Sequence, residues 1–353
     1  MKFKINNKFL LFIVIIIFYI KIFLFIVIKN DILSISLGGG NDADYYNGYA
    51  IGYFDLAVNI WPVILRYLYN IGLYSREIIS YIFVFINLLI IPLITNKISG
   101  LSFQKHQEYY LLGFLIYLVY PTIFIYTFDI YRDVFMVLVF LLSCWLVKFL
   151  LVSNKNIFSS LFLFLISVLM GLLLLGLRPY LGYAFLLALF LWKINLTKKR
   201  LALFAILYSM LLFIANYVGL FEALTVYRGG FEDIESGSTL GLDFSNPIMF
   251  IPNFILSMLG QLFGLYITNP LAMILFFIET VPFIFMLIYI VRNIKLADSF
   301  IRFLVIFFVL YASVWLIGND NLGTALRLRF YNYFSVYICF FYILRLKKLY
   351  LKK

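Results

Sequence analysis

Charged residues are scarce in this chain. Of its 353 residues only 12% are charged, whereas 65% are hydrophobic. Soluble globular domains carry roughly a quarter charged residues. The composition therefore excludes a soluble domain and indicates a protein that crosses a membrane several times. For such a chain the net charge of +12 is a property of its loops and gives no reason to expect nucleic acid as a partner.

Histidine and cysteine are almost absent. His106 is the one histidine, so the chain cannot build a metal site from several histidines or a Ser-His-Asp triad. Cys144 and Cys339 lie inside apolar runs, which indicates packed or lipid-facing thiols and neither a disulfide nor a metal site. No small-residue cleavage site follows the first apolar run, so we interpret that run as a retained membrane span and not as a signal peptide.

Long hydrophobic runs are what the chain has in abundance. Ten of them approach the length that crosses roughly 30 Å of hydrocarbon. They cover residues 9–28, 78–94, 110–128, 134–152, 157–176, 180–192, 201–220, 271–291, 300–317 and 330–344. The sequence therefore predicts an all-α, polytopic bundle of about ten transmembrane helices that forms a single integral membrane domain over residues 1–353.

Basic and acidic loops alternate along the chain, and this alternation predicts the orientation. Short cytoplasmic loops collect Lys and Arg, as do the loops that hold KKR at 198–200 and KKLYLKK at 347–353. Both termini are therefore predicted to be cytoplasmic. A further apolar stretch, 247–267, would reverse the last loops if it crossed the membrane. It contains Pro252 and Gln261 among several glycines, so we predict a re-entrant or interfacial segment on the outer side.

Two large outer loops follow from this orientation, 29–77 and 220–268. In the first, the apolar residues of AVNIWPVILRYLY at 57–69 recur at helical spacing and predict an amphipathic helix in the interface. The second is rich in glycine and acid, and its carboxylates could supply a metal ligand or a catalytic base. A solvated, flexible loop is the commoner explanation, so Mg²⁺ or Mn²⁺ stays open without being indicated. These acids are Glu232, Asp233, Glu235 and Asp243.

The segment GGGNDADYYNGYA at 38–50 is the first strongly polar stretch after the first apolar run. In an extended or loop conformation Asp42 and Asp44 would point the same way, and the glycines at 38–40 favour that conformation. Both carboxylates would then face one pocket. The alternative is that Asn41 or Asp42 caps a helix that begins here, because capping and catalysis use the same residue types.

A basic-tailed helix followed at once by an outer loop with D-x-D-Y resembles the GT-C class of polytopic glycosyltransferases. The resemblance covers about the first hundred residues and implies a GT-C-like fold, with Asp42 and Asp44 as catalytic base or metal ligands and with Tyr45 and Tyr46 beside the substrate. The short loops of the rest are similar to Wzy-type O-antigen and capsule polymerases. That similarity implies outer arginines that hold a lipid diphosphate, a bacterial inner membrane, and a chain-length regulator as a partner.

Several arginines fall in predicted outer segments, where the charge rule disfavours them unless they have a function. A guanidinium binds phosphate through two hydrogen bonds and stays charged at any working pH. We therefore predict a substrate-binding set that also includes neighbouring polar and aromatic residues. Its members are Arg132, Asp133, Arg178, Tyr180, Arg228, Arg327 and Arg329. The alternatives are that Arg132 pairs with Asp129 or Asp133, and that Arg327 and Arg329 contact lipid headgroups.

The expected function is polymerisation of undecaprenyl-diphosphate-linked repeat units at the outer face of the membrane, by an enzyme that needs no cofactor. The alternatives are a GT-C enzyme that adds one sugar from a polyprenyl-phosphate donor, and a flippase for lipid-linked oligosaccharide. Inside the spans, Lys21 and Glu279 are costly in hydrocarbon, so both are expected to face the protein interior. They could pair with each other, or Lys21 could extend to the interface.

Overall fold

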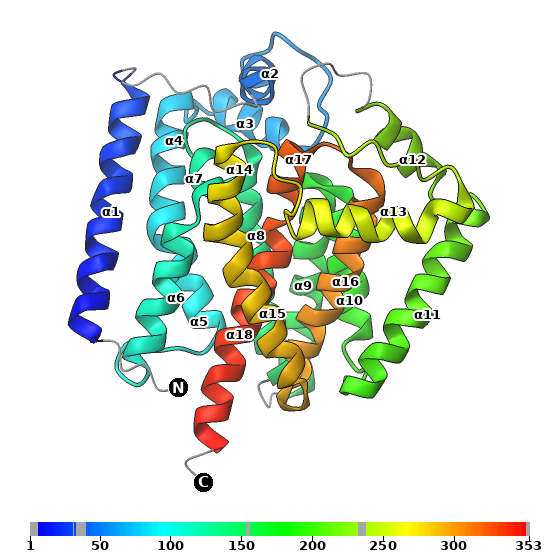
Figure 1. The fold of residues 1–353 in the computed structure, drawn as a ribbon. Helices are drawn as coiled ribbons and strands as arrows, with labels where there is room; N and C mark the ends of the chain where they lie inside the picture. The colour runs from blue at the N-terminus through cyan, green and yellow to red at the C-terminus, as the bar shows by residue number, and fades with distance from the viewer. Residues whose placement is uncertain (1–5, 31, 33–39, 153–155, 232–237, 351–353) are drawn as a thin grey trace. The chain divides into compact units, whose positions relative to one another are not determined.

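The computed structural model describes residues 6–30, 32, 40–152, 156–231 and 238–350. Within these ranges the regular secondary structure is helical, apart from an isolated β-bridge between Thr239 and Asn321. Seven helical stretches are long and apolar enough to cross a membrane (Figure 1). They are Asn7–Lys29, Arg76–Ile98, Arg132–Val152, Ile157–Leu177, Lys198–Tyr217, Pro270–Arg292 and Ser299–Gly318. The prediction of an all-α bundle of membrane helices is therefore confirmed.

The other three predicted spans do not form helices that are both long and apolar enough to cross a membrane, and the physical reason differs for each. The run 110–128 divides into α6 (Gln107–Val119) and α7 (Pro121–Ile125), because Tyr120 precedes a proline and leaves the helical region. Helix α10 (Pro179–Leu191) has only 13 residues. Helix α18 (Phe330–Tyr350) has 21 residues, but it is rich in tyrosine and ends in lysines.

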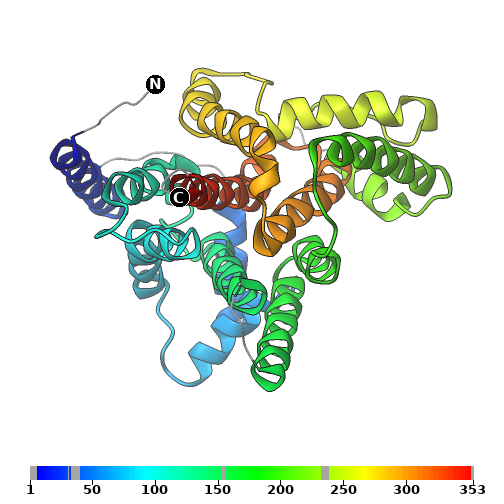
Figure 2. The ribbon, with the colours of Figure 1, turned by 90° about the horizontal axis from the view of Figure 1, so that it is seen from below.

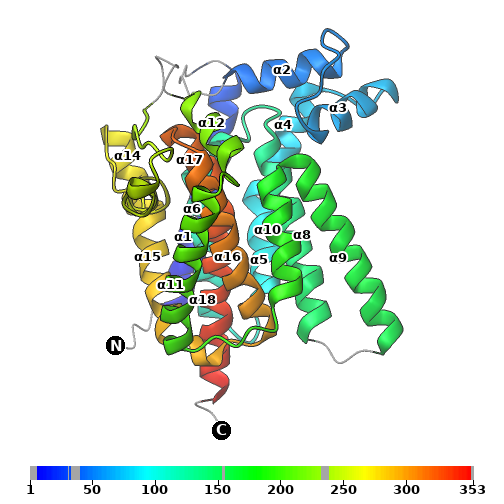
Figure 3. The same ribbon diagram turned by 90° about the vertical axis from the view of Figure 1, so that its right-hand side faces the viewer.

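The chain divides into two compact units, Met1–Tyr183 and Ala184–Lys353, and α10 spans the division. In the first unit α1 packs against α6, α5 packs against α6 and α8, and α8 lies beside α9. Helices α2 and α3 pack on each other, and Figure 3 shows α2 running crosswise to α8 and α9. The bounds are α1 Asn7–Lys29, α2 Gly40–Ala50, α3 Ile60–Asn70, α4 Arg76–Phe85, η1 Ile86–Ile90, α5 Ile91–Ile98, α8 Arg132–Val152 and α9 Ile157–Leu177.

In the second unit α18 packs against both α15 and α16, as the view along the helices shows (Figure 2). Helix α13 contacts α11 and α16 and runs crosswise to them (Figure 1), which is the direction an interfacial segment needs. The bounds are α11 Lys198–Tyr217, α12 Glu222–Gly229, η2 Pro247–Met249, α13 Phe250–Ser257, η3 Met258–Leu262, α14 Pro270–Leu275, η4 Phe276–Thr280, α15 Val281–Arg292, η5 Ile294–Leu296, α16 Ser299–Gly318 and α17 Leu322–Leu328.

Polar side chains start several of these helices. The side-chain oxygen of Asn6 accepts from Lys8 N at the start of α1, Ser75 does the same for α4, and Asp298 caps α16. Each satisfies a backbone N–H that has no partner inside the helix. Caps of this kind hold helix starts in place at the ends of apolar runs.

Three helices contain a π-helical turn: η1, η3 and η4. A π turn inserts one extra residue and rotates the side chains that follow it, and such turns are frequent at functional sites. Each of these turns contains a buried polar side chain, namely Asn87, Gln261 and Glu279 respectively. The turns therefore position polar groups inside otherwise apolar helices.

Candidate functional site

The two predicted catalytic acids lie on a helix. Helix α2 begins at Gly40, so Asp42 is in its first turn and the prediction of an extended or loop conformation is wrong. Residues two apart on a helix point about 200° away from each other. Asp44 is accordingly exposed, with 69% of its side chain accessible, whereas Asp42 is partly buried. The alternative interpretation, that a helix starts at this segment, is the better description of its backbone.

Asp44 belongs to a cluster that gathers three distant segments of the first unit. Arg76, at the start of α4, donates from Nη2 to Asp44 Oδ1 at 2.7 Å. It also contacts Asp129 through both of its own donors, Nε at 2.7 Å and Nη2 at 2.5 Å. Two parallel bonds of this kind fix the orientation of a guanidinium. Sequence reasoning missed Arg76, although an arginine at the outer end of a predicted span was the signal that could have found it.

Neighbouring residues pin α2 in place. Tyr74 donates its hydroxyl to Asn47 Oδ1 at 2.7 Å, and burial raises the pKa of Tyr74 to about 12, against the nearby positive charge of Arg76, which lowers it. Arg66 of α3 donates to the backbone carbonyls of Tyr49 and Phe54, at 2.9 and 2.7 Å. Helix α2 is thus held to α3 and to the loop before α4.

The predicted substrate tyrosines of α2 contribute to packing. Tyr45 donates its hydroxyl to the carbonyl of Leu56 and stacks on Phe54, with ring centroids 5.5 Å apart. Tyr46 is buried. Sugar stacking on these rings therefore stays a prediction, and the contacts of Tyr45 are with the loop that follows α2.

Arg132, Asp133, Arg178 and Tyr180 lie together in the first unit. Asp133 and Arg178 are both buried and face each other at 3.8 Å between Oδ1 and Nη2. Arg132 is half-buried and donates to the carbonyl of Leu177 at 3.0 Å. The guanidinium of Arg178 lies 5.9 Å from the ring centroid of Tyr180. Pairing of Arg132 with Asp129 or Asp133, the alternative raised above, is not the observed arrangement.

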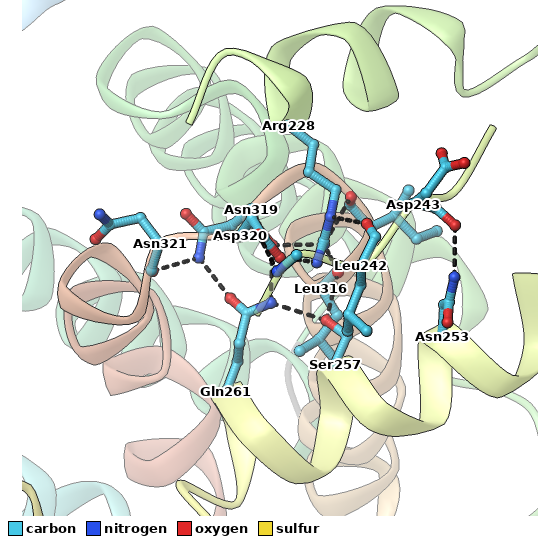
Figure 4. Close-up of polar contacts among 12 residues, drawn as sticks. Arg228, Leu242, Asp243, Asn253, Ser257, Gln261, Leu316, Asn319, Asp320 and Asn321 are labelled. Atoms are coloured by element: carbon cyan, nitrogen blue, oxygen red, sulfur yellow. Dashed lines mark hydrogen bonds and ion pairs between the residues drawn. The ribbon is translucent and has the colours of Figure 1, made fainter. Parts of the chain in front are cut away.

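In the second unit Arg228 is a buried structural hub (Figure 4). It pairs with Asp320 and donates to the backbone carbonyls of Leu242 at 2.8 Å, Leu316 at 3.0 Å and Asn319 at 2.6 Å. Asp320 Oδ2 also accepts from the backbone N–H of Gly241 at 2.9 Å. Arg228 thereby satisfies carbonyls at the C-terminal end of α16 and fastens the segment 241–242 to it.

An amide network adjoins this hub. Gln261 Nε2 donates to the carbonyl of Asn319 at 2.7 Å and to Ser257 Oγ at 2.8 Å, and Asn319 Nδ2 donates back to Gln261 Oε1 at 2.5 Å (Figure 4). Ser257 in turn donates to the carbonyl of Leu316 at 2.7 Å. The π turn η3 is therefore locked onto the end of α16.

Arg329 is the second buried arginine of this unit. Its Nη2 donates to Glu279 Oε2 at 2.7 Å, and both side chains are at most 3% exposed. Lys21, in the first unit, donates instead to the carbonyl of Tyr120 at 3.0 Å. Both charged residues of the spans are buried, as expected. Lys21 and Glu279 belong to different units, and their pairing stays a prediction. Arg327 is partly exposed at the end of α17.

A cavity of about 310 Å³ lies beside Arg329, entirely within the second unit. Its walls come from η3 and the residues after it, from α14 and from α17. Gln261 and Arg329, both described above, are part of its lining. The cavity therefore joins one predicted substrate residue to groups that sequence reasoning did not single out.

Metal-ligating residues are not clustered in the part of the chain that the structure describes, where no group of three or more His, Cys, Asp or Glu could hold an ion. Glu232, Asp233 and Glu235 lie outside the described residues. Asp243 accepts from the backbone N–H of Ser245 at 2.7 Å, and its hydrogen bonds to Ser245 lower the pKa of Asp243. Asp243 therefore stabilises a local turn.

Relatives do not supply an identification. Comparisons with protein-family models, with curated proteins and with solved structures find no match for this chain. The functional argument therefore rests on the residues described above.

Proposed function

We propose that this chain is a membrane glycosyltransferase that polymerises undecaprenyl-diphosphate-linked repeat units of O-antigen or capsule at the outer face of a bacterial inner membrane. The observation that carries the proposal is the cluster of Asp44, Arg76 and Asp129, whose Asp44 lies on the same helix as Asp42. It gathers carboxylates and a guanidinium from three separate segments at one end of the apolar helices of the first unit. At the end of membrane helices, carboxylates are suited to proton transfer and a guanidinium is suited to phosphate binding.

The two aspartates receive different roles. Asp44 is already engaged by Arg76 at 2.7 Å, so we assign it to the orientation of that guanidinium. Asp42, partly buried one helical face away, is assigned as the general base. The acceptor hydroxyl attacks the anomeric carbon of the donor sugar and its proton passes to the carboxylate of Asp42. The bond from the anomeric carbon to the phosphate oxygen breaks, and the diphosphate leaves with the electron pair.

Phosphate binding falls to the arginines that are not enclosed. Arg178, Arg228 and Arg329 are buried against Asp133, Asp320 and Glu279, and their burial closes them to a phosphate. Arg76 and Arg132 of the first unit are only half-buried, and we assign the leaving diphosphate to them. Arg327 is the corresponding candidate of the second unit.

Separate substitutions of the two acids test the proposal. Asp42→Asn removes the proton acceptor at nearly constant shape, and we expect polymer formation to fall about 10²- to 10⁴-fold, leaving single-repeat product on a gel. Asp44→Asn loosens Arg76 and should reduce polymer formation less. Asp55→Asn is the matched control, because Asp55 lies in the same predicted outer loop with a fully exposed side chain. The membrane level of each variant is measured in parallel.

Three outcomes would contradict the proposal. Full activity of both variants at normal abundance would leave the acids with a helix-start role only. A changed composition of the repeat would indicate a single-sugar transferase of the GT-C class. Lipid-linked repeat retained on the inner leaflet in a strain that lacks the protein would indicate a flippase.

A further inference from the structure

The cavity of the second unit has the size and lining of a small-molecule site. Its volume of about 310 Å³ lies at the lower end of the range of about 300–1,000 Å³ that is typical of ligand pockets. Apolar residues of α14 and α17 form part of its wall. Its uncharged polar lining consists of Ser238, Gln261, Tyr266, Thr268, Asn269 and Asn321.

The charge of this lining is balanced. Among the described residues that line the cavity, Arg329 is the one that carries a charge, and its guanidinium is bound to Glu279 at 2.7 Å. Both groups are buried, so the pair brings no net charge to the cavity. A diphosphate placed here would lack a counter-charge unless the buried pair separated, which would leave Glu279 uncompensated. An uncharged ligand carries no such penalty.

The polar groups of the lining suit a ligand with several hydroxyls. Side-chain amides and hydroxyls both donate and accept hydrogen bonds. Asn321 Oδ1 accepts from the backbone N–H of Thr324 at 2.8 Å, and Asn269 Oδ1 accepts from Ala272 at 2.8 Å. In both side chains the oxygen is thus used as a helix cap. The NH₂ group of Asn321 is left to donate, and that of Asn269, which donates to Thr268 Oγ1 at 3.4 Å, keeps its second hydrogen. Tyr266 is half-exposed and offers a ring for the apolar face of a sugar.

A glycine keeps the wall of the cavity close to the ion pair. Gly264 has a φ of +58°, and a Cβ there would come within 3.0 Å of Arg329 Nη1 and 3.2 Å of Thr280 Oγ1. A side chain at position 264 would therefore be strained and would displace the guanidinium. Glycine lets the backbone pass over Arg329 without disturbing its contact with Glu279.

We propose that this cavity binds an uncharged sugar unit, held by its amide and hydroxyl groups and stacked against Tyr266. The assignment of that sugar to the repeat unit rests on the proposed function, whereas the binding of an uncharged sugar rests on the cavity alone. Arg329 is then a positioning residue that acts through its ion pair with Glu279. This role replaces the phosphate binding that was predicted for Arg329 from its position in the sequence.

Direct binding to the full chain in nanodiscs tests this. The probes are the methyl glycosides of glucose, rhamnose and N-acetylglucosamine, followed by saturation-transfer NMR, and inorganic pyrophosphate, followed by ³¹P line width. Ala272→Phe places a ring in the cavity, and Met273→Phe adds a ring at the next residue of α14, which is half-exposed and lies outside the lining. We expect at least one glycoside to receive saturation, with affinity reduced about tenfold by Ala272→Phe and unchanged by Met273→Phe.

A second variant covers the case in which Ala272→Phe does not fold. Tyr266→Ala shortens a half-exposed side chain and should weaken the same glycoside without affecting abundance. Absence of saturation transfer to all three glycosides would overturn the proposal, and so would transfer that neither variant reduces. Pyrophosphate broadening that Ala272→Phe abolishes would also overturn it, in favour of an anion site.

The result stays separate from the test of the proposed function. Asp42→Asn should leave glycoside binding intact, because Asp42 is not part of the cavity lining. If the Asp42 and Asp44 variants polymerise normally, the glycosyltransferase proposal fails while sugar binding to the cavity stands. If the cavity fails to bind sugar, the reaction assigned to the first unit is unaffected.

Discussion

Arginine in the predicted outer segments of a membrane protein calls for a reason, and at the residue scale the structure gives a reason other than substrate for three of these arginines. Arg178, Arg228 and Arg329 each have a buried acid partner. The partners of Arg228 and Arg329 are 92 and 50 residues away along the chain. The positive-inside rule could identify these arginines as exceptions. It cannot predict which acid each arginine pairs with when the two residues are so far apart in sequence.

Arg228 provides a prediction about stability. Arg228→Met should lower the free energy of unfolding by about 3–5 kcal/mol, because it leaves the buried Asp320 without its counter-charge. Thermal unfolding in detergent measures the change. The double variant Arg228→Met/Asp320→Leu should recover much of the loss, since it removes both charges together. The exposed Arg292→Met serves as the control, and an Arg228→Met protein that melts with the native one would exclude a structural role.

Tyr74 provides a prediction about pH. Its pKa in the folded protein is raised to about 12 from 10.0, chiefly by burial. A raised pKa means that the folded state keeps the proton longer than the unfolded chain. The stability contributed by Tyr74 is therefore fully present below pH 10 and is lost as pH rises from 10 to about 12.

Ionisation of Tyr74 would also end its hydrogen-bond donation to Asn47. The absorbance at 295 nm reports phenolate formation, and the difference between the native protein and Tyr74→Phe isolates this residue. We expect a midpoint near pH 12 in that difference. A midpoint at the ordinary value of 10.0 would mean that the phenol is solvated and does not anchor α2.

At the element scale, periodicity and run length predicted most of the fold. Seven spans and the amphipathic helix α3 follow from residues that are close in sequence. Two other features, the end of α6 and the start of α2, depended on how opposing signals in the sequence were weighed. Pro121 ends α6, although its run is apolar throughout, and α2 begins at Gly40, within the run of glycines before Asp42. The π turns were not predictable, because one extra residue in a helix leaves no mark in an apolar sequence.

Trp61 docks helix α3 on the segment around the start of α8. Trp61 is 3% exposed, donates from Nε1 to the carbonyl of Ile130 at 2.8 Å and stacks on Phe135 with centroids 4.9 Å apart. Trp61→Ala should destabilise the protein by about 3–5 kcal/mol through the cavity that it leaves. Trp61→Phe keeps most of the packing and should cost about 1–3 kcal/mol for the unsatisfied carbonyl.

Unfolding in detergent, followed by circular dichroism, gives both values. Tyr67→Ala is the control on the other face of α3, because Tyr67 is 65% exposed, and it should change stability by no more than about 0.5 kcal/mol. Equal effects of the substitutions at positions 61 and 67 would show that α3 is not docked through its tryptophan. The positions of Asp44 on α2 and of Arg76 on α4 would then need another support.

At the scale of the whole molecule, the candidate site was only partly accessible from sequence. Asp44 was identified, but its partner Arg76 was not, and the cavity beside Arg329 joins segments from Ser238 to Arg329 that no local pattern connects. Contacts of this kind depend on how helices pack. Local hydrophobicity can place a residue at one end of a span, but it cannot say which side chains of other spans meet it there.

The path of the chain around α13 provides the last prediction, since it fixes the orientation of everything after it. If 247–267 stays on the outer side, both of its flanks face the same solution. Ser245→Cys and Thr268→Cys should then both react with a membrane-impermeant maleimide in intact cells, because both positions are exposed. The native Cys144 and Cys339 are buried and should give little background. Lys193→Cys, in a basic and exposed loop, should react only after permeabilisation.

A crossing segment would give the opposite pattern, with labelling of one flank in intact cells and of the other only after permeabilisation. That result would place the loop after Arg292 and the lysines near the end of α18 outside, against the positive-inside rule. It would also put the two ends of the segment 247–267 at different leaflets. Because the cavity is lined by Ser238 near one end and by Thr268 near the other, same-side labelling of both flanks is the arrangement in which a sugar at the outer surface reaches both walls.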